Sequence, residues 1–104
     1  MNFGFIGAGN MVSAIVKGMT IGTKSYDGSC IYITSKFGTS AQELAKITSA
    51  NYCKNAQEVI SFSDVLILGV KPHVLSEILP QLKKEIDEYE NNIVSIEDCP
   101  KAVQ

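Results

Sequence analysis

An uninterrupted apolar run, VLILGV at residues 65–70, constrains the fold of this chain more than any other stretch. A strand with one face in water alternates apolar and polar residues, and this run shows no such alternation. Runs of this kind are typical of a central strand in a parallel sheet, where helices cover both faces. We therefore expect the flanking sequence to supply further parallel strands together with the helices that connect them.

The remaining sequence agrees with that expectation, because short strand-like runs alternate with helix-like segments. The predicted strands are at residues 2–6, 30–34, 51–53, 65–70 and 92–96, and the predicted helices are at residues 10–22, 40–49 and 74–89, with a further short helix that begins at Asn55. Within the first helix, Met11, Ile15 and Met19 recur at the spacing of one helical face.

Local signals mark the boundaries of several helices. Ser40 and Glu43 have the S-x-x-E spacing of a capping box, which predicts that they close the N-terminus of the second helix. Asn55, followed by Glu58, predicts the start of the third helix. Pro80 should end or kink the fourth helix, because proline lacks the N–H that a helix interior needs.

Strands that alternate with helices require crossover connections, which are right-handed and build a doubly wound parallel sheet. The predicted fold class is therefore α/β, a Rossmann-like doubly wound parallel sheet of about five strands with helices on both faces. A chain of 104 residues has the size of one domain. We assign residues 1–96 to this domain and residues 97–104 to an atypical C-terminal tail.

Composition excludes several classes of function. A net charge of −2 without a basic block argues against a nucleic-acid partner. No apolar run approaches the ~20 residues that span a bilayer, and no signal-peptide pattern is present, so we expect a cytoplasmic protein without a membrane partner. Cys30, Cys53 and Cys99 show no C-x-x-C spacing, so we expect passive thiols and no metal site.

The glycine-containing segment GAGN follows the first strand and opens the first helix. Gly7 permits the tight turn out of the sheet, and Gly9 leaves room for a pyrophosphate to approach the backbone. The helix that begins near Asn10 offers backbone N–H groups and the positive end of its dipole to phosphates. Val12 replaces the third glycine of the usual G-x-G-x-x-G, which predicts either a wider helix packing or a close contact through Ala14. The turn predicts a dinucleotide site, with a ligand-free strand-to-helix turn as the alternative.

The end of the second strand indicates which dinucleotide is bound. NAD sites carry an Asp or Glu in this region, which binds the ribose hydroxyls. The corresponding segment, YITSKFGTS, has no carboxylate and offers Ser35 and Lys36 instead. A hydroxyl beside a cation suits the 2′-phosphate of NADP, which a carboxylate would repel. We therefore predict NADPH over NADH, with an ordinary surface lysine as the alternative for Lys36.

The loop after the fourth strand is the second candidate site. Ligands of open α/β sheets bind beyond the carboxyl ends of the strands, where the strand order reverses, and Val70, Lys71 and Pro72 stand at that position. Pro72 restricts Lys71 to an extended conformation, and such a rigid loop can stack along the nicotinamide ribose; a plain turn is the alternative. His73, the only histidine, lies beside this loop, but we expect a helix residue there because no partnering carboxylate or nucleophile is evident.

Three segments together resemble one protein family. FGFIGAGNM, DVLILGVKPHVL and NIVSI are similar to the N-terminal domain of the pyrroline-5-carboxylate reductases, over about residues 1–96. Members of that family reduce 1-pyrroline-5-carboxylate, a small imino acid, to L-proline in the last step of proline biosynthesis. Their hydride comes from NADPH or NADH. The resemblance implies an NADP(H)-binding domain of such a reductase, with NAD(H) as a second cofactor.

The resemblance also implies roles for individual segments. The first turn would hold the pyrophosphate, Ser35 and Lys36 the adenosine ribose or its phosphate, and Asn55 the adenosine side. The loop after the fourth strand would line the nicotinamide half, near Ser95 and Ile96. Catalytic residues are left unassigned. The cofactor-binding residues that the resemblance implies are Ile6, Gly7, Ala8, Gly9, Asn10, Met11, Ser35, Lys36, Asn55, Gly69, Val70, Lys71 and Pro72.

The C-terminal end departs from the family pattern. EDCPKAVQ stands where two alanines and a glycine usually follow the last strand, and we expect the family's helical dimerisation domain of about 150 residues to be absent. That domain supplies most of the substrate pocket, so we expect a chain that binds the cofactor without catalysing the reaction alone. Two alternatives stay open: a non-catalytic module that binds a dinucleotide or assembles as a homo-oligomer, and a domain like the deazaflavin-dependent NADP reductases, which share the opening turn.

Overall fold

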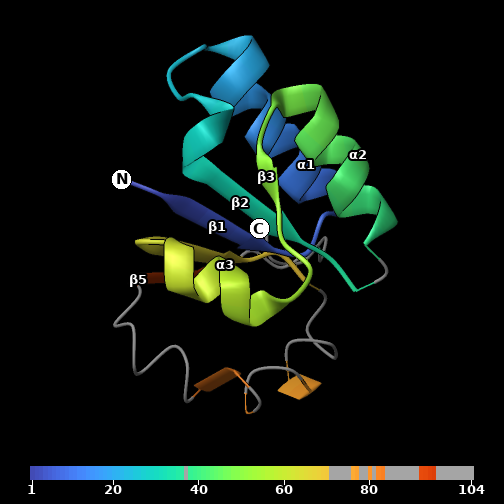
Figure 1. Ribbon diagram of the computed structural model, residues 1–104, viewed down its shortest axis with the longest axis vertical. Helices are drawn as coiled ribbons and strands as arrows, with labels where there is room; N and C mark the ends of the chain where they lie inside the picture. Colours follow the sequence, from blue (N-terminus) through green and yellow to red (C-terminus); the bar gives the residue numbers. More distant parts are fainter. Residues whose placement is uncertain (37, 71–75, 78–79, 81, 84–91, 96–104) are drawn as a thin grey trace, which may run out of the picture.

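Figure 1 shows the computed structural model, which describes residues 1–36, 38–70, 76–77, 80, 82–83 and 92–95. Parallel strands form one five-stranded sheet in the order β3-β2-β1-β4-β5. The strands are β1 (Phe3–Ile6), β2 (Ile31–Thr34), β3 (Asn51–Tyr52), β4 (Val65–Leu68) and β5 (Asn92–Ser95). The strand order reverses between β1 and β4, which confirms the doubly wound α/β fold predicted from the sequence.

Helices cover both faces of this sheet. They are α1 (Asn10–Lys17), which continues as a π-helical turn (Gly18–Gly22), a short 3-10 helix (Gly28–Cys30), α2 (Thr39–Thr48) and α3 (Ala56–Phe62). Figure 1 shows α1 and α2 together on one face and α3 on the other. No helix in the described part of the chain is both long enough and apolar enough to cross a membrane.

The apolar run at β4 packs against helices on both sides. Ile67 belongs to the core cluster that contains residues of α1 and α2, whereas Leu66 and Leu68 belong to the cluster that contains residues of α3. Alternate residues of a strand point to opposite faces, so a strand covered on both faces must be apolar throughout. The prediction drawn from VLILGV is confirmed, although the strand itself ends at Leu68 and leaves Gly69 and Val70 in the following loop.

The strand register brings the carboxyl ends of the strands to one line. Ile6, the last residue of β1, pairs with Thr34 of β2 on one side and with Leu68 of β4 on the other. Leu68 in turn pairs with Ser95, the last residue of β5. The loops that follow these strands therefore leave the sheet at the same edge.

The first helix differs in detail from the prediction over residues 10–22. Regular α-helix ends at Lys17, and the last turn is π-helical. Val12 and Val16 are fully buried. Met11 and Ile15 are only half-buried, so the face that packs on the sheet is rotated by one residue from the predicted stripe.

The capping box predicted for Ser40 and Glu43 is wrong. The N-cap of α2 is Gly38, which has a φ of +80° and no side-chain capping bond, so both residues of the predicted box lie inside the helix. The backbone N–H of Ala41 instead donates to Oγ of Ser35, at 3.3 Å. Glycine at the N-cap turns the chain into the helix earlier than the S-x-x-E pattern indicates.

The prediction for α3 is confirmed, because the N–H of Glu58 donates to Oδ1 of Asn55 at 2.9 Å. The predicted helix at residues 74–89 lies mostly outside the described residues; residues 76–77, 80 and 82–83 are helical. Pro80 itself is helical, but its neighbours on both sides, which bear on the predicted kink, lie outside the described residues, as does the domain boundary after residue 96.

Candidate functional site

The turn after β1 is hydrogen-bonded on one side to the end of β2 and on the other to the loop after β4. The N–H of Gly7 donates to the carbonyl of Thr34 at 2.8 Å, and the N–H of Gly69 donates to the carbonyl of Ile6 at 2.9 Å. Gly7 has a φ of +107°, which side chains with a Cβ rarely adopt, and a Cβ there would overlap the carbonyl oxygen of Gly69. The fold itself therefore requires Gly7.

Val12 replaces the third glycine of the usual motif. Its side chain packs against Gly69, in the loop after β4. A Cβ added to Gly69, just after β4, would overlap Cγ2 of Val12. Val12 is 1% exposed, whereas Ala14 is exposed, so the predicted close contact through Ala14 is wrong. Gly69 is thus the glycine that lets α1 lie close to the sheet. The side chain of Val12 occupies the space that a Cβ on residue 69 would take.

The N-terminus of α1 opens toward solvent. Gly9 is its N-cap and forms no side-chain capping bond. The first bond of the helix runs from the N–H of Ser13 to the carbonyl of Gly9, at 2.9 Å, so the N–H groups of Asn10, Met11 and Val12 have no acceptor within the helix. A Cβ added at Gly9 would meet no atom within 4 Å. Open space in front of these N–H groups suits an anion.

The end of β2 supplies side chains instead of backbone groups. Thr34 is buried, Ser35 is half-buried and Lys36 is exposed. Ser35 accepts the N–H of Ala41 and keeps its own O–H as a donor. A hydroxyl and a cation favour an anionic ligand group beside the end of β2.

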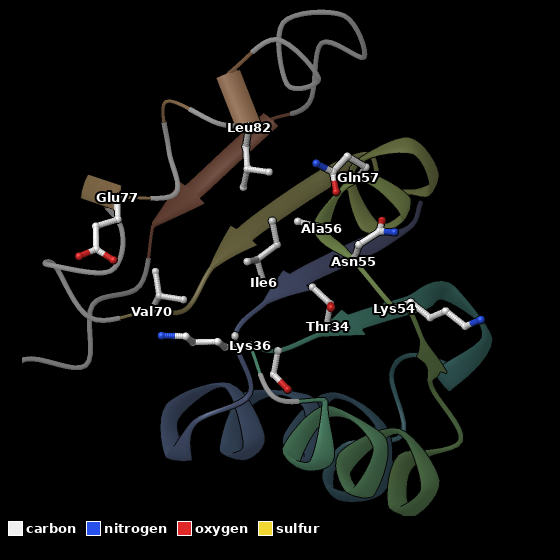
Figure 2. Close-up of a pocket in the computed structure, with 12 residues that line it drawn as sticks. Ile6, Thr34, Lys36, Lys54, Asn55, Ala56, Gln57, Val70, Glu77 and Leu82 are labelled. Carbon is white, nitrogen blue, oxygen red and sulfur yellow. The ribbon is translucent and has the colours of Figure 1, made fainter.

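A cavity of about 310 Å³ lies at this edge of the sheet (Figure 2). It collects residues that end or follow β1, β2, β3 and β4, which the parallel register brings together. The lining residues are Ile6, Gly7, Thr34, Ser35, Lys36, Lys54, Asn55, Ala56, Gln57, Val70, Glu77 and Leu82. Its volume lies at the lower end of the ~300–1,000 Å³ typical of small-molecule sites, which suits a part of a dinucleotide.

A smaller cavity of about 190 Å³ lies between α1 and α2, beside the glycine turn. Residues of α1, of α2 and of the turn before α1 line it. They are Ala8, Gly9, Asn10, Ser13, Lys17, Ser40, Glu43, Leu44 and Ile47.

The predicted cofactor residues divide between these places. Those in the larger cavity are Ile6, Gly7, Ser35, Lys36, Asn55 and Val70. Those in the smaller cavity are Ala8, Gly9 and Asn10. Met11 and Gly69 line neither cavity, although Gly69 packs beneath Val12. Lys71 and Pro72 lie outside the described residues, as do His73 and Ile96.

Sequence reasoning missed four polar lining residues, which are Thr34, Lys54, Gln57 and Glu77. Lys36 and Lys54 follow the ends of different strands, and Figure 2 shows their side chains pointing away from each other. A usable signal was present, because Lys54 follows the third strand and the ends of parallel strands converge at one edge.

Two groups near β3 have structural roles of their own. Asn55 uses Oδ1 to cap α3, which leaves its Nδ2 amide as the donor that a ligand could meet. Burial, together with the charge of Glu58, raises the pKa of the Cys53 thiol above its ordinary value. That thiol is therefore neutral near pH 7. Within the described part of the chain, no three His, Cys, Asp or Glu side chains group as metal ligands would.

Comparison with known proteins links this geometry to reductases. The chain is 32% identical over 97 residues to pyrroline-5-carboxylate reductase from Staphylococcus aureus and 30% identical to that from Staphylococcus epidermidis. These matches cover 92% of this chain and 35% of each relative, so the chain spans about a third of the length of the curated relatives it matches. It is related to the N-terminal NAD(P)-binding domain of those reductases.

Solved structures show the same fold. A pyrroline-5-carboxylate reductase from Coxiella burnetii superposes with a TM-score of 0.82 at 25% identity, over 92% of this chain and 35% of that one. An imine reductase variant from Myxococcus stipitatus in complex with NAD+ gives 0.73 at 20% identity, over 98% of this chain and 33% of that one. Plasmodium falciparum pyrroline carboxylate reductase with NADP bound gives 0.70 at 22% identity, over 92% and 33%. A family model described as NADP oxidoreductase, coenzyme F420-dependent, matches residues 2–97. The chain belongs to this family of NADP oxidoreductases.

Proposed function

We propose that this chain is the NADP(H)-binding domain of a pyrroline-5-carboxylate reductase. The observation that carries the proposal is the meeting, at one sheet edge, of a glycine turn with open N–H groups and a strand end that offers hydroxyls and a cation. The curated relatives at 30–32% identity carry the name of that enzyme, which supports the choice of reaction.

Backbone groups would hold the pyrophosphate. The N–H groups of Asn10, Met11 and Val12 point out of the start of α1, and Gly9 leaves the approach open. A diphosphate at that position would accept charge-assisted hydrogen bonds, each worth about 1.5–3 kcal/mol. These contacts do not distinguish NADPH from NADH, because both cofactors carry the same pyrophosphate.

Side chains after β2 would distinguish the cofactors. Lys36 and Ser35 would bind the 2′-phosphate that only NADPH carries, and Lys54 is a second basic residue in the cavity lining. The relative from Plasmodium falciparum holds NADP and the imine reductase holds NAD+, so related folds accept either cofactor. The absence of a carboxylate from residues 31–36 supports NADPH for this chain.

The nicotinamide half would lie toward the loop after β4, where Gly69 and Val70 precede Lys71 and Pro72. In the reductase reaction the reduced nicotinamide supplies a hydride to the carbon of the C=N bond, and the nitrogen is protonated to give the amine of proline. Hydride transfer needs both reactants held in register. We assign cofactor binding to this chain and the imino-acid pocket to the remainder of the reductase, because the chain spans 35% of its relatives' length.

A second candidate is a deazaflavin-dependent NADP oxidoreductase domain, which the description of the matching family favours. Both candidates bind NADP(H) at the same edge and differ in the partner that exchanges the hydride. An assay of NADPH oxidation with 1-pyrroline-5-carboxylate, run beside one of NADP+ reduction with reduced coenzyme F420, separates them. Turnover with the deazaflavin and none with the imine would select the second candidate.

Calorimetric titration with NADPH and NADH tests the binding proposal. We expect NADPH to bind at least about tenfold more tightly than NADH, since a charged hydrogen bond contributes about 1.5 kcal/mol or more. A preference for NADH would refute the assignment of Ser35 and Lys36. No binding of either cofactor at millimolar concentration would refute the proposed function.

A further inference from the structure

One buried hydroxyl in the wall of the larger cavity forms no hydrogen bond with any residue that the structure describes. The described residues contain three buried polar side chains, those of Thr34, Thr48 and Ser63. Thr48 donates to the carbonyl of Leu44 at 2.7 Å, and Ser63 donates to the carbonyl of Val59 at 2.5 Å. No residue in the described ranges forms a hydrogen bond with the hydroxyl of Thr34. Buried polar side chains are nearly always paired, so this exception needs an explanation.

The backbone holds this hydroxyl in place. Thr34 ends β2, pairs with Ile6 of β1, and accepts the N–H of Gly7 through its carbonyl at 2.8 Å. Its side chain is 4% exposed and lines the cavity. Figure 2 shows it among the lining residues, in this view between Ile6 and Lys54. A β-branched side chain on a strand has few rotamers, so the hydroxyl meets a ligand with little further ordering.

The surroundings of Thr34 indicate what kind of group it would meet. Ile6, Ala56 and Leu82 give the cavity apolar walls, and Lys36, two residues after Thr34, also lines it. Apolar walls beside a fixed hydroxyl suit a ligand with a planar apolar body and polar atoms at its edge, such as a nucleoside. A phosphate alone would leave the apolar walls unused.

We propose that the hydroxyl of Thr34 hydrogen-bonds the adenosine half of the bound dinucleotide and contributes equally to NADPH and NADH binding. This inference rests on the proposed function and adds a contact that is independent of the 2′-phosphate. Thr34 would set affinity for the nucleoside common to both cofactors, whereas Lys36 would set the preference between them.

Three variants test this proposal. Thr34→Val keeps the β-branched shape and removes the hydroxyl, and Thr34→Ser keeps the hydroxyl. Thr48→Val is the matched control, because it removes a buried hydroxyl that is already paired within α2. Calorimetry with NADPH, NADH and 5′-AMP measures affinity for each variant, and thermal unfolding without ligand measures its stability.

We expect Thr34→Val to weaken all three ligands by the same factor, about five- to tenfold, the usual effect of one lost hydrogen bond. Thr34→Ser and Thr48→Val should bind within about twofold of the unchanged chain. Without ligand, Thr34→Val should melt no lower than the unchanged chain, because the hydroxyl it removes has no hydrogen-bond partner among the described residues.

Other outcomes overturn the proposal. Unchanged NADH and AMP affinity in Thr34→Val would show that the hydroxyl is not a contact, while the proposed function would stand. A loss of affinity confined to NADPH would show that Thr34 binds the 2′-phosphate. That result would contradict a contact that is independent of this phosphate. If the unchanged chain bound none of the three ligands, the proposed function would fail and this inference with it.

Discussion

The turn after β1 and the loop after β2 lie side by side, because Ile6 and Thr34 pair at the ends of their strands. The first offers backbone N–H groups and is built from glycines packed against a neighbouring loop. The second offers side chains, a buried hydroxyl and an exposed lysine among them. In the proposed binding mode, the group common to all dinucleotides would be bound by backbone atoms that the fold itself fixes. The choice between dinucleotides would depend on side chains, among them the exposed Lys36.

The largest effect is expected from Gly7→Ala. The backbone there has a φ of +107°, and the new Cβ would overlap the carbonyl oxygen of Gly69. Strain and overlap together should lower the free energy of unfolding by about 2–5 kcal/mol. Urea unfolding followed by circular dichroism measures this loss. A variant as stable as the unchanged chain would contradict the claim that the β1 turn is fixed by the fold.

The next effect concerns the contact between Val12 and Gly69. Gly69→Ala should destabilise the chain by about 1–3 kcal/mol, because its Cβ would overlap Cγ2 of Val12. Val12→Ala makes room for that methyl group, so the double variant should be more stable than the sum of the two single losses predicts. A double-mutant cycle by urea unfolding should give a coupling energy of about 1 kcal/mol or more. Additive losses would show that the two residues do not share this space.

Gly9→Ala should separate binding from stability within the same turn. Its Cβ would meet no protein atom within 4 Å, and Gly9 has a φ of −78°, so the free energy of unfolding should change by less than about 0.5 kcal/mol. The methyl group would occupy the approach to the N–H groups of α1. Affinity for both NADPH and NADH should fall by about tenfold or more, since charged hydrogen bonds are weakened. Unchanged affinity would mean that the pyrophosphate lies elsewhere.

The smallest effect is expected after β2. Lys36→Gln should weaken NADPH about three- to tenfold and leave NADH within about twofold, because exposed charged contacts are partly screened by solvent. Lys46→Gln is the matched control, since Lys46 is an exposed lysine of α2 that does not line the cavities described. Calorimetry at low and high salt measures both variants. Equal losses for NADPH and NADH would remove Lys36 from the choice of cofactor.

Local patterns predicted the elements well and their contacts less well. The doubly apolar run at β4 and the cap at Asn55 are properties of a few adjacent residues, and both predictions are confirmed. The close packing of Val12 on Gly69 joins residues far apart in the chain, so no local sequence pattern indicates it.

Contacts between residues distant in sequence also account for the wrong capping box at α2 and for the cavity-lining residues that were not predicted. Ser35 reaches the N–H of Ala41 only because Gly38 turns the chain between them. Thr34 and Lys54 share the cavity wall because the register aligns the ends of β2 and β3 with that of β1, and their separation in the sequence hides this.

Nuclear magnetic resonance titration of the isotope-labelled chain tests the central claim most directly, because every backbone amide reports separately. With NADPH and with NADH, the amides of Asn10, Met11 and Val12 should shift alike. The amides of Ser35 and Lys36 should shift further with NADPH, which alone carries the 2′-phosphate. Equal shifts after β2 with both cofactors, or shifts away from the carboxyl edge of the sheet, would contradict the division of labour between the two loops.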